Sequence, residues 1–125
     1  MTAKMILCAL AVTALASPVL AASYPISGAW GESKTTGNDK VDCTKVRVMD
    51  FRGEQRTDTG GSVHAYKNVS VTPSGSNAWK VADTFANGQI RNARVIYTLK
   101  KIGDDRLELA LDKGGTIKLQ RCGKK

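Results

Sequence analysis

The feature that most constrains the fold is a period-two alternation of apolar and polar or small residues, which recurs in short segments along the chain. It is clearest at Leu107, Leu109 and Leu111, where leucine occupies every second position. Alternation of this kind is typical of a strand with one buried face, and Gly, Asn, Asp and Ser separate the segments. Beyond residue 22 we find no helical periodicity of useful length. The pattern therefore predicts an all-β domain.

Strands are expected at 27–33, 43–51, 67–72, 78–85, 90–102, 107–111 and 117–120. Their connections are short, and Asn87-Gly88 is a typical hairpin turn. The stretch 54–66 is irregular, with Gly60-Gly61 at its middle. Short antiparallel strands with local connections leave exposed edges unless the sheet closes on itself. We therefore predict a small antiparallel up-and-down barrel of seven or eight strands.

The first 22 residues are built like a secretory signal peptide. They combine a positive start at Lys4, an apolar stretch and a small-residue cleavage pattern at 19–21. The apolar run is too short to span a bilayer stably, and no later segment is apolar enough to do so. We expect a signal peptide at 1–22 and a single domain at 23–125. The expected location is periplasmic or extracellular, without stable membrane insertion after cleavage.

Removal of the signal peptide leaves two cysteines, Cys43 and Cys122. In an oxidising compartment an even number of cysteines favours a disulfide. The bridge would close a loop of about 80 residues, which is worth roughly 4.5 kcal/mol in chain entropy. The spacing excludes a redox-active C-x-x-C pair. We predict a structural disulfide between these two residues.

The expected mature chain keeps 18 of the 19 basic residues and all 11 acidic ones, a formal charge of +7. A basic balance is compatible with an anionic partner. The cations are scattered along the chain, which favours a solubilising surface over a dedicated anion site. We expect no specific binding of nucleic acid.

Gly28-Ala29-Trp30 opens the first expected strand, and Arg121 lies near the end of the last one. This pattern resembles the calycin barrels, the lipocalins and their relatives, in which a tryptophan closes one barrel end and a late basic side chain packs on its ring. The resemblance implies barrel closure by Trp30 and Arg121, with a cation–π contact on the order of 1 kcal/mol. In size, export and single disulfide the chain is also similar to bacterial inhibitors of secreted metalloproteases. Their inhibitory N-terminal arm would correspond to residues 23–26.

Two features suggest catalysis, and each has a plainer explanation. Asp58-Thr59-Gly60 matches the aspartic-protease triplet, whose chemistry needs two aspartates that share a proton. The segment before it, 53–57, is polar and lacks the apolar strand of that family, so a turn role for Asp58 is favoured. His64 is the only histidine, and the sequence offers it no partners for a triad or a metal site. We expect no enzymatic activity, no metal and no cofactor.

The irregular stretch is the candidate binding loop, because long glycine-bearing loops on rigid strands concentrate binding residues. Its polar and aromatic members are Arg56, Asp58, His64 and Tyr66. The alternative is a surface connection without a binding role.

The segment 78–85 places Trp79, Val81 and Phe85 on one side of a strand, although Asp83 falls on that same side. Trp79 and Phe85, together with Tyr66 and Tyr97, either line a ligand cavity or fill the core. The second arrangement is favoured in a barrel of this size.

The predicted function is a non-enzymatic exported binding protein of the bacterial envelope or extracellular space. Its partner would be a small ligand or a protein. The alternative is an inhibitor of a secreted hydrolase, which would act through the N-terminal arm or a loop at the barrel end.

Overall fold

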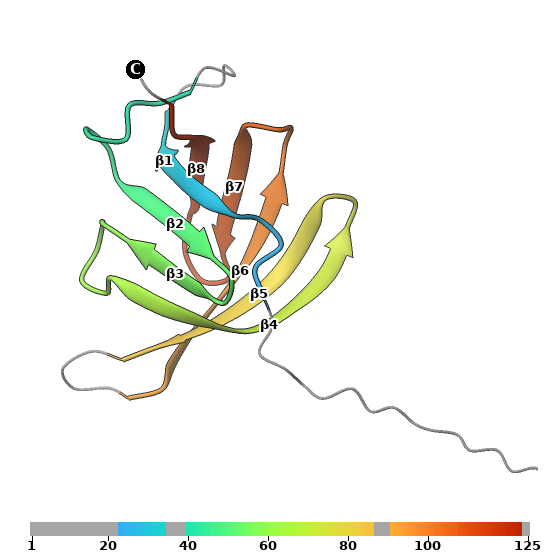
Figure 1. The fold of residues 1–125 in the computed structure, drawn as a ribbon. Helices are drawn as coiled ribbons and strands as arrows, with labels where there is room; N and C mark the ends of the chain where they lie inside the picture. Colours follow the sequence, from blue (N-terminus) through green and yellow to red (C-terminus); the bar gives the residue numbers. More distant parts are fainter. Residues whose placement is uncertain (1–22, 35–39, 87–90, 124–125) are drawn as a thin grey trace, which may run out of the picture.

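The protein is an eight-stranded closed barrel, seen here in a computed structural model that describes residues 23–34, 40–86 and 91–123. Its strands are β1 Gly28–Glu32, β2 Val48–Arg52, β3 Gln55–Asp58, β4 Ala65–Gly75, β5 Ala78–Phe85, β6 Ala93–Lys101, β7 Arg106–Leu111 and β8 Thr116–Arg121. Each strand pairs antiparallel with the next, and β8 pairs with β1 (Figure 1). The predicted all-β, up-and-down barrel is confirmed, with eight strands.

Some predicted features lie outside the described residues. They are the signal peptide at 1–22 and the Asn87-Gly88 turn. Within the part of the chain that the structure describes, no helix is long and apolar enough to cross a membrane.

β3 and the start of β4 fall in the stretch that we predicted to be irregular, and that prediction is wrong for 55–58 and 65–66. The buried positions of β3 are Arg56 and Asp58, and Asn68 is buried on β4. Because polar side chains fill the inward positions of β3, this strand lacks the apolar alternation by which strands are recognised. The connection between β3 and β4 is reduced to 59–64.

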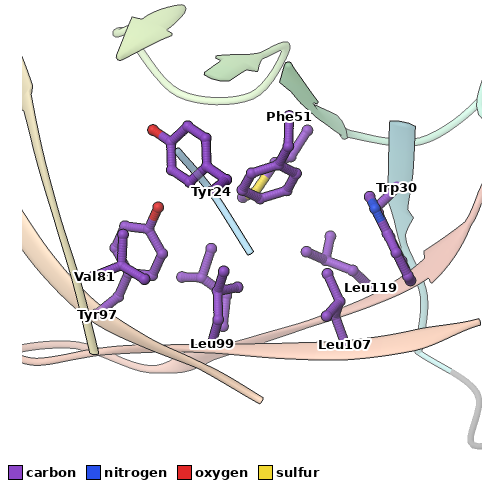
Figure 2. Packing of buried hydrophobic residues seen from close by; sticks show 10 residues of the cluster. Tyr24, Trp30, Phe51, Val81, Tyr97, Leu99, Leu107 and Leu119 are labelled. Carbon is purple, nitrogen blue, oxygen red and sulfur yellow. The ribbon is translucent and has the colours of Figure 1, made fainter. Parts of the chain in front are cut away.

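The barrel interior is occupied by side chains from its own strands and from the segment before β1. The buried cluster consists of Tyr24, Trp30, Met49, Phe51, Val81, Tyr97, Leu99, Leu107, Leu109 and Leu119. Figure 2 shows Tyr24 and Tyr97 at one end of this row and Trp30 at the other. One end of the core is therefore apolar, whereas phenol hydroxyls reach into the other.

Trp30 lies at the apolar end with no exposed surface, and its Nε1 donates a hydrogen bond to the Ser27 carbonyl oxygen at 3.1 Å. The Arg121 guanidinium carbon lies 4.3 Å from the centre of the indole ring. Arg121 Nε also donates to Asp105 Oδ1 at 3.2 Å. The arginine is thus held over the ring by an acceptor on the β6–β7 connection.

Cys43 and Cys122 form the predicted disulfide, with Cα atoms 5.5 Å apart. The segment that carries Cys43 precedes β2 and lies against β1, rather than forming the strand expected over 43–47. At Gly31 an added Cβ would lie 2.7 Å from Cys43 Sγ and 2.6 Å from a Val41 methyl group. Glycine at this position therefore allows the bridged segment to lie flat on the barrel wall.

Candidate functional site

A cluster of buried charged and polar side chains occupies the interior beside β3, β4 and β5. Its centre is Arg56, whose side chain is 4% exposed, and Asp83, which has no exposed surface. Arg56 Nε donates to Asp83 Oδ2 at 3.0 Å, and its Nη2 lies 3.0 Å from the same oxygen. A buried charge is tolerated only when it is paired and hydrogen-bonded, and this geometry meets that condition.

Two further donors complete the environment of Asp83. The Tyr97 hydroxyl donates to Oδ2 at 2.7 Å, and Asn68 Nδ2 lies 3.2 Å from Oδ1. Asn68 Nδ2 also lies 3.2 Å from the carbonyl oxygens of Ser70 and Ala82, beside the irregularity in the β4–β5 ladder. The carboxylate is therefore tied to three neighbouring strands, which makes the cluster a rigid part of the wall.

The Arg56 guanidinium lies near two aromatic rings. Its central carbon is 3.8 Å from the Tyr66 ring centre and 5.1 Å from that of Tyr97. Cation–π contacts of this kind are strongest where water is excluded. Tyr66 in turn meets Phe85 edge to face, with ring centres 5.4 Å apart. The buried cation thus packs against Tyr66, which together with Phe85 forms a partly buried aromatic pair.

A second ion pair joins Asp58 to the segment before β2. Arg47 Nε and Nη2 donate to the two carboxylate oxygens, each at 2.9 Å. The Gly60 amide donates to Asp58 Oδ1 at 2.8 Å, so the carboxylate also holds the turn after β3. Arg56 Nη1 is 3.7 Å from Asp58 Oδ2, which links the two ion pairs. The positive charges of the two arginines and the negative charges of the two carboxylates therefore cancel within the cluster.

Burial governs the protonation of the tyrosines in the cluster. It raises the pKa of the Tyr97 and Tyr24 phenols well above the ordinary value, and the charge of Asp83 acts in the same direction. Burial also raises the pKa of Tyr66. For Arg56, burial alone would lower the pKa, but Tyr97 and Asp83 outweigh it, and the pKa is raised. Arg56 therefore remains a cation and the phenols remain neutral.

These shifts predict a loss of stability at alkaline pH. Below about pH 10 the tyrosines are protonated in both states, so they add no pH dependence. Above that pH the unfolded chain releases protons that Tyr97 and Tyr24 retain in the folded state. The free energy of unfolding should fall by about 1.4 kcal/mol per pH unit for each such tyrosine. Urea titrations from pH 8 to 11 measure this slope. Tyr97→Phe should reduce this slope by the contribution of about one proton. An unchanged slope in that variant would contradict the raised pKa of Tyr97.

A surface depression of about 320 Å³ lies beside the Tyr66–Phe85 pair. We call it the aromatic depression; it is lined by Gln55, Ala65, Tyr66, Lys67, Thr84, Phe85, Ala86 and Asn92. Its lining combines two partly buried aromatic residues, Tyr66 and Phe85, with residues that bear amide, hydroxyl and ammonium groups. A few directed polar groups around an apolar surface are typical of ligand sites.

The structure places the four sequence-predicted binding residues in different surroundings. Arg56 and Asp58 are buried in β3 rather than placed on a loop, and Tyr66 stacks on Arg56. Tyr66 alone of the four lines the aromatic depression. His64 has an exposed side chain in the connection 59–64, and its carbonyl oxygen accepts the Asp58 amide hydrogen at 2.9 Å. We find no group of three or more His, Cys, Asp and Glu side chains arranged to hold a metal ion in the described part of the chain.

The sequence interpretation missed Arg47, Asn68 and Asp83 as members of the cluster. A signal was present for Asp83, because a carboxylate on the core-facing side of a strand requires a buried cation or donor. Arg47 and Asn68 gave no such signal, since their partners are set by the register of other strands.

The N-terminal arm is anchored to the barrel. Tyr24 is 7% exposed and packs edge to face on Phe51, with ring centres 5.1 Å apart. Its amide donates to the Gly53 carbonyl oxygen at 2.9 Å. Within the arm, Ser23 is exposed and Ile26 packs against the core. An inhibitor acting through this arm would have to release Tyr24 from the interior.

Comparisons with protein-family models, curated proteins and solved structures found no match. The class of this protein is therefore defined by its own fold and site. The protein is a closed eight-stranded antiparallel β-barrel with one disulfide, an architecture compatible with the calycin barrels.

Proposed function

We propose that this protein is a non-enzymatic, exported binding protein of calycin-like type, and that its ligand docks in the aromatic depression. The observation that carries the proposal is the Tyr66–Phe85 pair, which is braced from beneath by the buried Arg56. A rigid aromatic surface loses little conformational entropy when a ligand binds. The filled interior favours a site on the wall rather than a ligand within the barrel.

Export is supported by two independent features. The first 22 residues have the pattern of a signal peptide, and the Cys43–Cys122 bridge suits an oxidising compartment. Together they favour the periplasm or the extracellular space. The cluster supplies no accessible nucleophile, since Asp58 and Asp83 are both buried and engaged by arginines. A binding role is therefore favoured over catalysis.

Native mass spectrometry tests the proposal on mature protein purified without refolding from its own organism. We expect a non-covalent adduct, of one mass or of several related masses. Thr84→Trp should abolish the adduct, because the new ring fills the aromatic depression from its wall. Thr116→Trp is the matched control, since Thr116 is exposed on β8 and does not line the depression.

The two variants separate the outcomes. An adduct retained by Thr84→Trp would place the ligand elsewhere and contradict the site. A bare wild-type monomer would contradict ligand binding and favour a protein target. The alternative of a hydrolase inhibitor that acts through a loop at the barrel end would then be tested first.

A further inference from the structure

The outward positions of β4, β5 and β6 carry four cations and no carboxylate. We call these residues the basic face: Lys67, Lys80, Arg94 and Lys100, all of them exposed. The acidic residue within these strands is Asp83, which points inward and is paired with Arg56. Cations that are scattered along the sequence are thus gathered on one side of the barrel.

The strand register sets the spacing of these cations. Lys67 lies opposite Thr84, and Thr84 lies opposite Arg94, so the three form one row across the strands. Neighbouring strands are about 4.8 Å apart, which places the row ends about 10 Å from each other. Lys80 is four residues from Thr84, or about 13 Å along the strand. The charges are therefore well separated rather than concentrated at one point.

Most of this charge is not neutralised. Among the described residues, no ion pair engages Lys80 or Arg94. Lys67 reaches Glu54 at 4.0 Å, and because the lysine side chain is 63% exposed such a pair contributes little. Glu108 lies opposite Lys100 at the border of the basic face. By contrast, Arg52 on β2 is paired with Asp50 at 2.9 Å.

The row from Lys67 to Arg94 connects two depressions. Lys67 and Thr84 belong to the aromatic depression. Arg94 belongs to a second one of about 280 Å³, lined by Arg94, Val95, Ile96, Leu111, Asp112 and Lys113. A ligand that used both would have to be elongated and lie across β5 and β6.

We infer that the ligand is an acidic saccharide chain, whose sugar rings pack in the aromatic depression and whose acid groups pair with the basic face. This inference rests on the proposed binding function and names its ligand class. Tyr66 and Phe85 suit the C–H faces of a pyranose ring, and Gln55 and Asn92 suit its hydroxyl groups. The wide cation spacing suits a polymer that carries at most one acid group per sugar ring. It is a poor match to duplex DNA, which carries one charge per about 1.7 Å.

Fluorescence anisotropy with a labelled oligogalacturonate measures the interaction at low salt. Lys80→Gln/Arg94→Gln should weaken binding by about tenfold or more, because two unneutralised cations are lost. The control Lys45→Gln/Arg52→Gln removes the same charge from the segment before β2 and from β2 itself. It should change the affinity by less than about twofold. A neutral dextran oligosaccharide of the same length should bind about tenfold more weakly than oligogalacturonate.

Each contrary result overturns a defined part of the inference. Equal losses of affinity in the two double variants would show that only the net charge of the protein matters. The basic face would then be ruled out as the binding surface. Dextran binding as tight as that of oligogalacturonate would show that the ligand need not be acidic. A single-stranded oligonucleotide that binds more tightly than oligogalacturonate would assign the basic face to nucleic acid. If the purified protein carries a Thr84-dependent adduct but does not bind oligogalacturonate, the binding function stands and the ligand class is wrong.

Discussion

Replacing Asp83 with Asn should lower the free energy of unfolding by about 3 to 5 kcal/mol, because it leaves the Arg56 cation buried without its main counter-charge. Arg56 makes contacts at 3.0 Å to this carboxylate, while its distance to Asp58 is 3.7 Å. The same substitution removes the charged acceptor of the Tyr97 hydroxyl. Urea unfolding followed by tryptophan fluorescence measures the loss.

A matched exposed pair controls for the general effect of removing a carboxylate. Asp50→Asn breaks the pair with Arg52, whose side chain is 80% exposed, and it should cost far less stability than Asp83→Asn because solvent screens an exposed pair. Similar losses in the two variants would contradict the special role of the buried pair.

A double variant separates the pair's contribution from the penalty for an unpaired charge. Arg56→Met/Asp83→Leu removes both charges and keeps apolar volume in the interior. Buried ion pairs replaced in this way are often no less stable, so we expect the double variant to be more stable than Asp83→Asn. Because Arg56 also stacks on Tyr66, the double variant should nevertheless lose ligand binding. Intact binding would show that the aromatic depression does not depend on the cation beneath it.

Removing the disulfide with Cys43→Ser/Cys122→Ser should destabilise the folded protein by roughly 4.5 kcal/mol. The bridge joins residues 79 apart in the sequence and ties the segment before β2 to the end of β8. Small domains have unfolding free energies of about 5 to 15 kcal/mol, so the variant should be near its limit of stability. Urea unfolding of the variant measures this loss.

Wild-type protein unfolded in the presence of a reductant serves as the control and should match the double serine variant. Thiol titration of the oxidised protein under denaturing conditions should detect no free thiol from Cys43 or Cys122. A loss of stability below about 1 kcal/mol would contradict a large entropic effect of the bridge on the unfolded chain.

The strands with apolar inward positions were predictable because their signal is local. In β7, Leu107 and Leu109 are buried on the alternating positions that the sequence indicates. β3 was missed for the opposite reason, since Arg56 and Asp58 fill its inward positions. A polar strand becomes recognisable only when the neighbours that satisfy its side chains are known.

The sequence by itself determined the strand-rich fold, its closure into a small barrel, and the pairing of Cys43 with Cys122. Period-two burial and cysteine parity are properties of short segments or of simple counts, so they need no three-dimensional information. Only the tertiary structure decided that Arg56 meets Asp83, 27 residues away, and that Lys67, Lys80 and Arg94 share one face. Register and barrel closure set those juxtapositions, because a shift of one residue turns every side chain of a strand to the opposite face of the sheet.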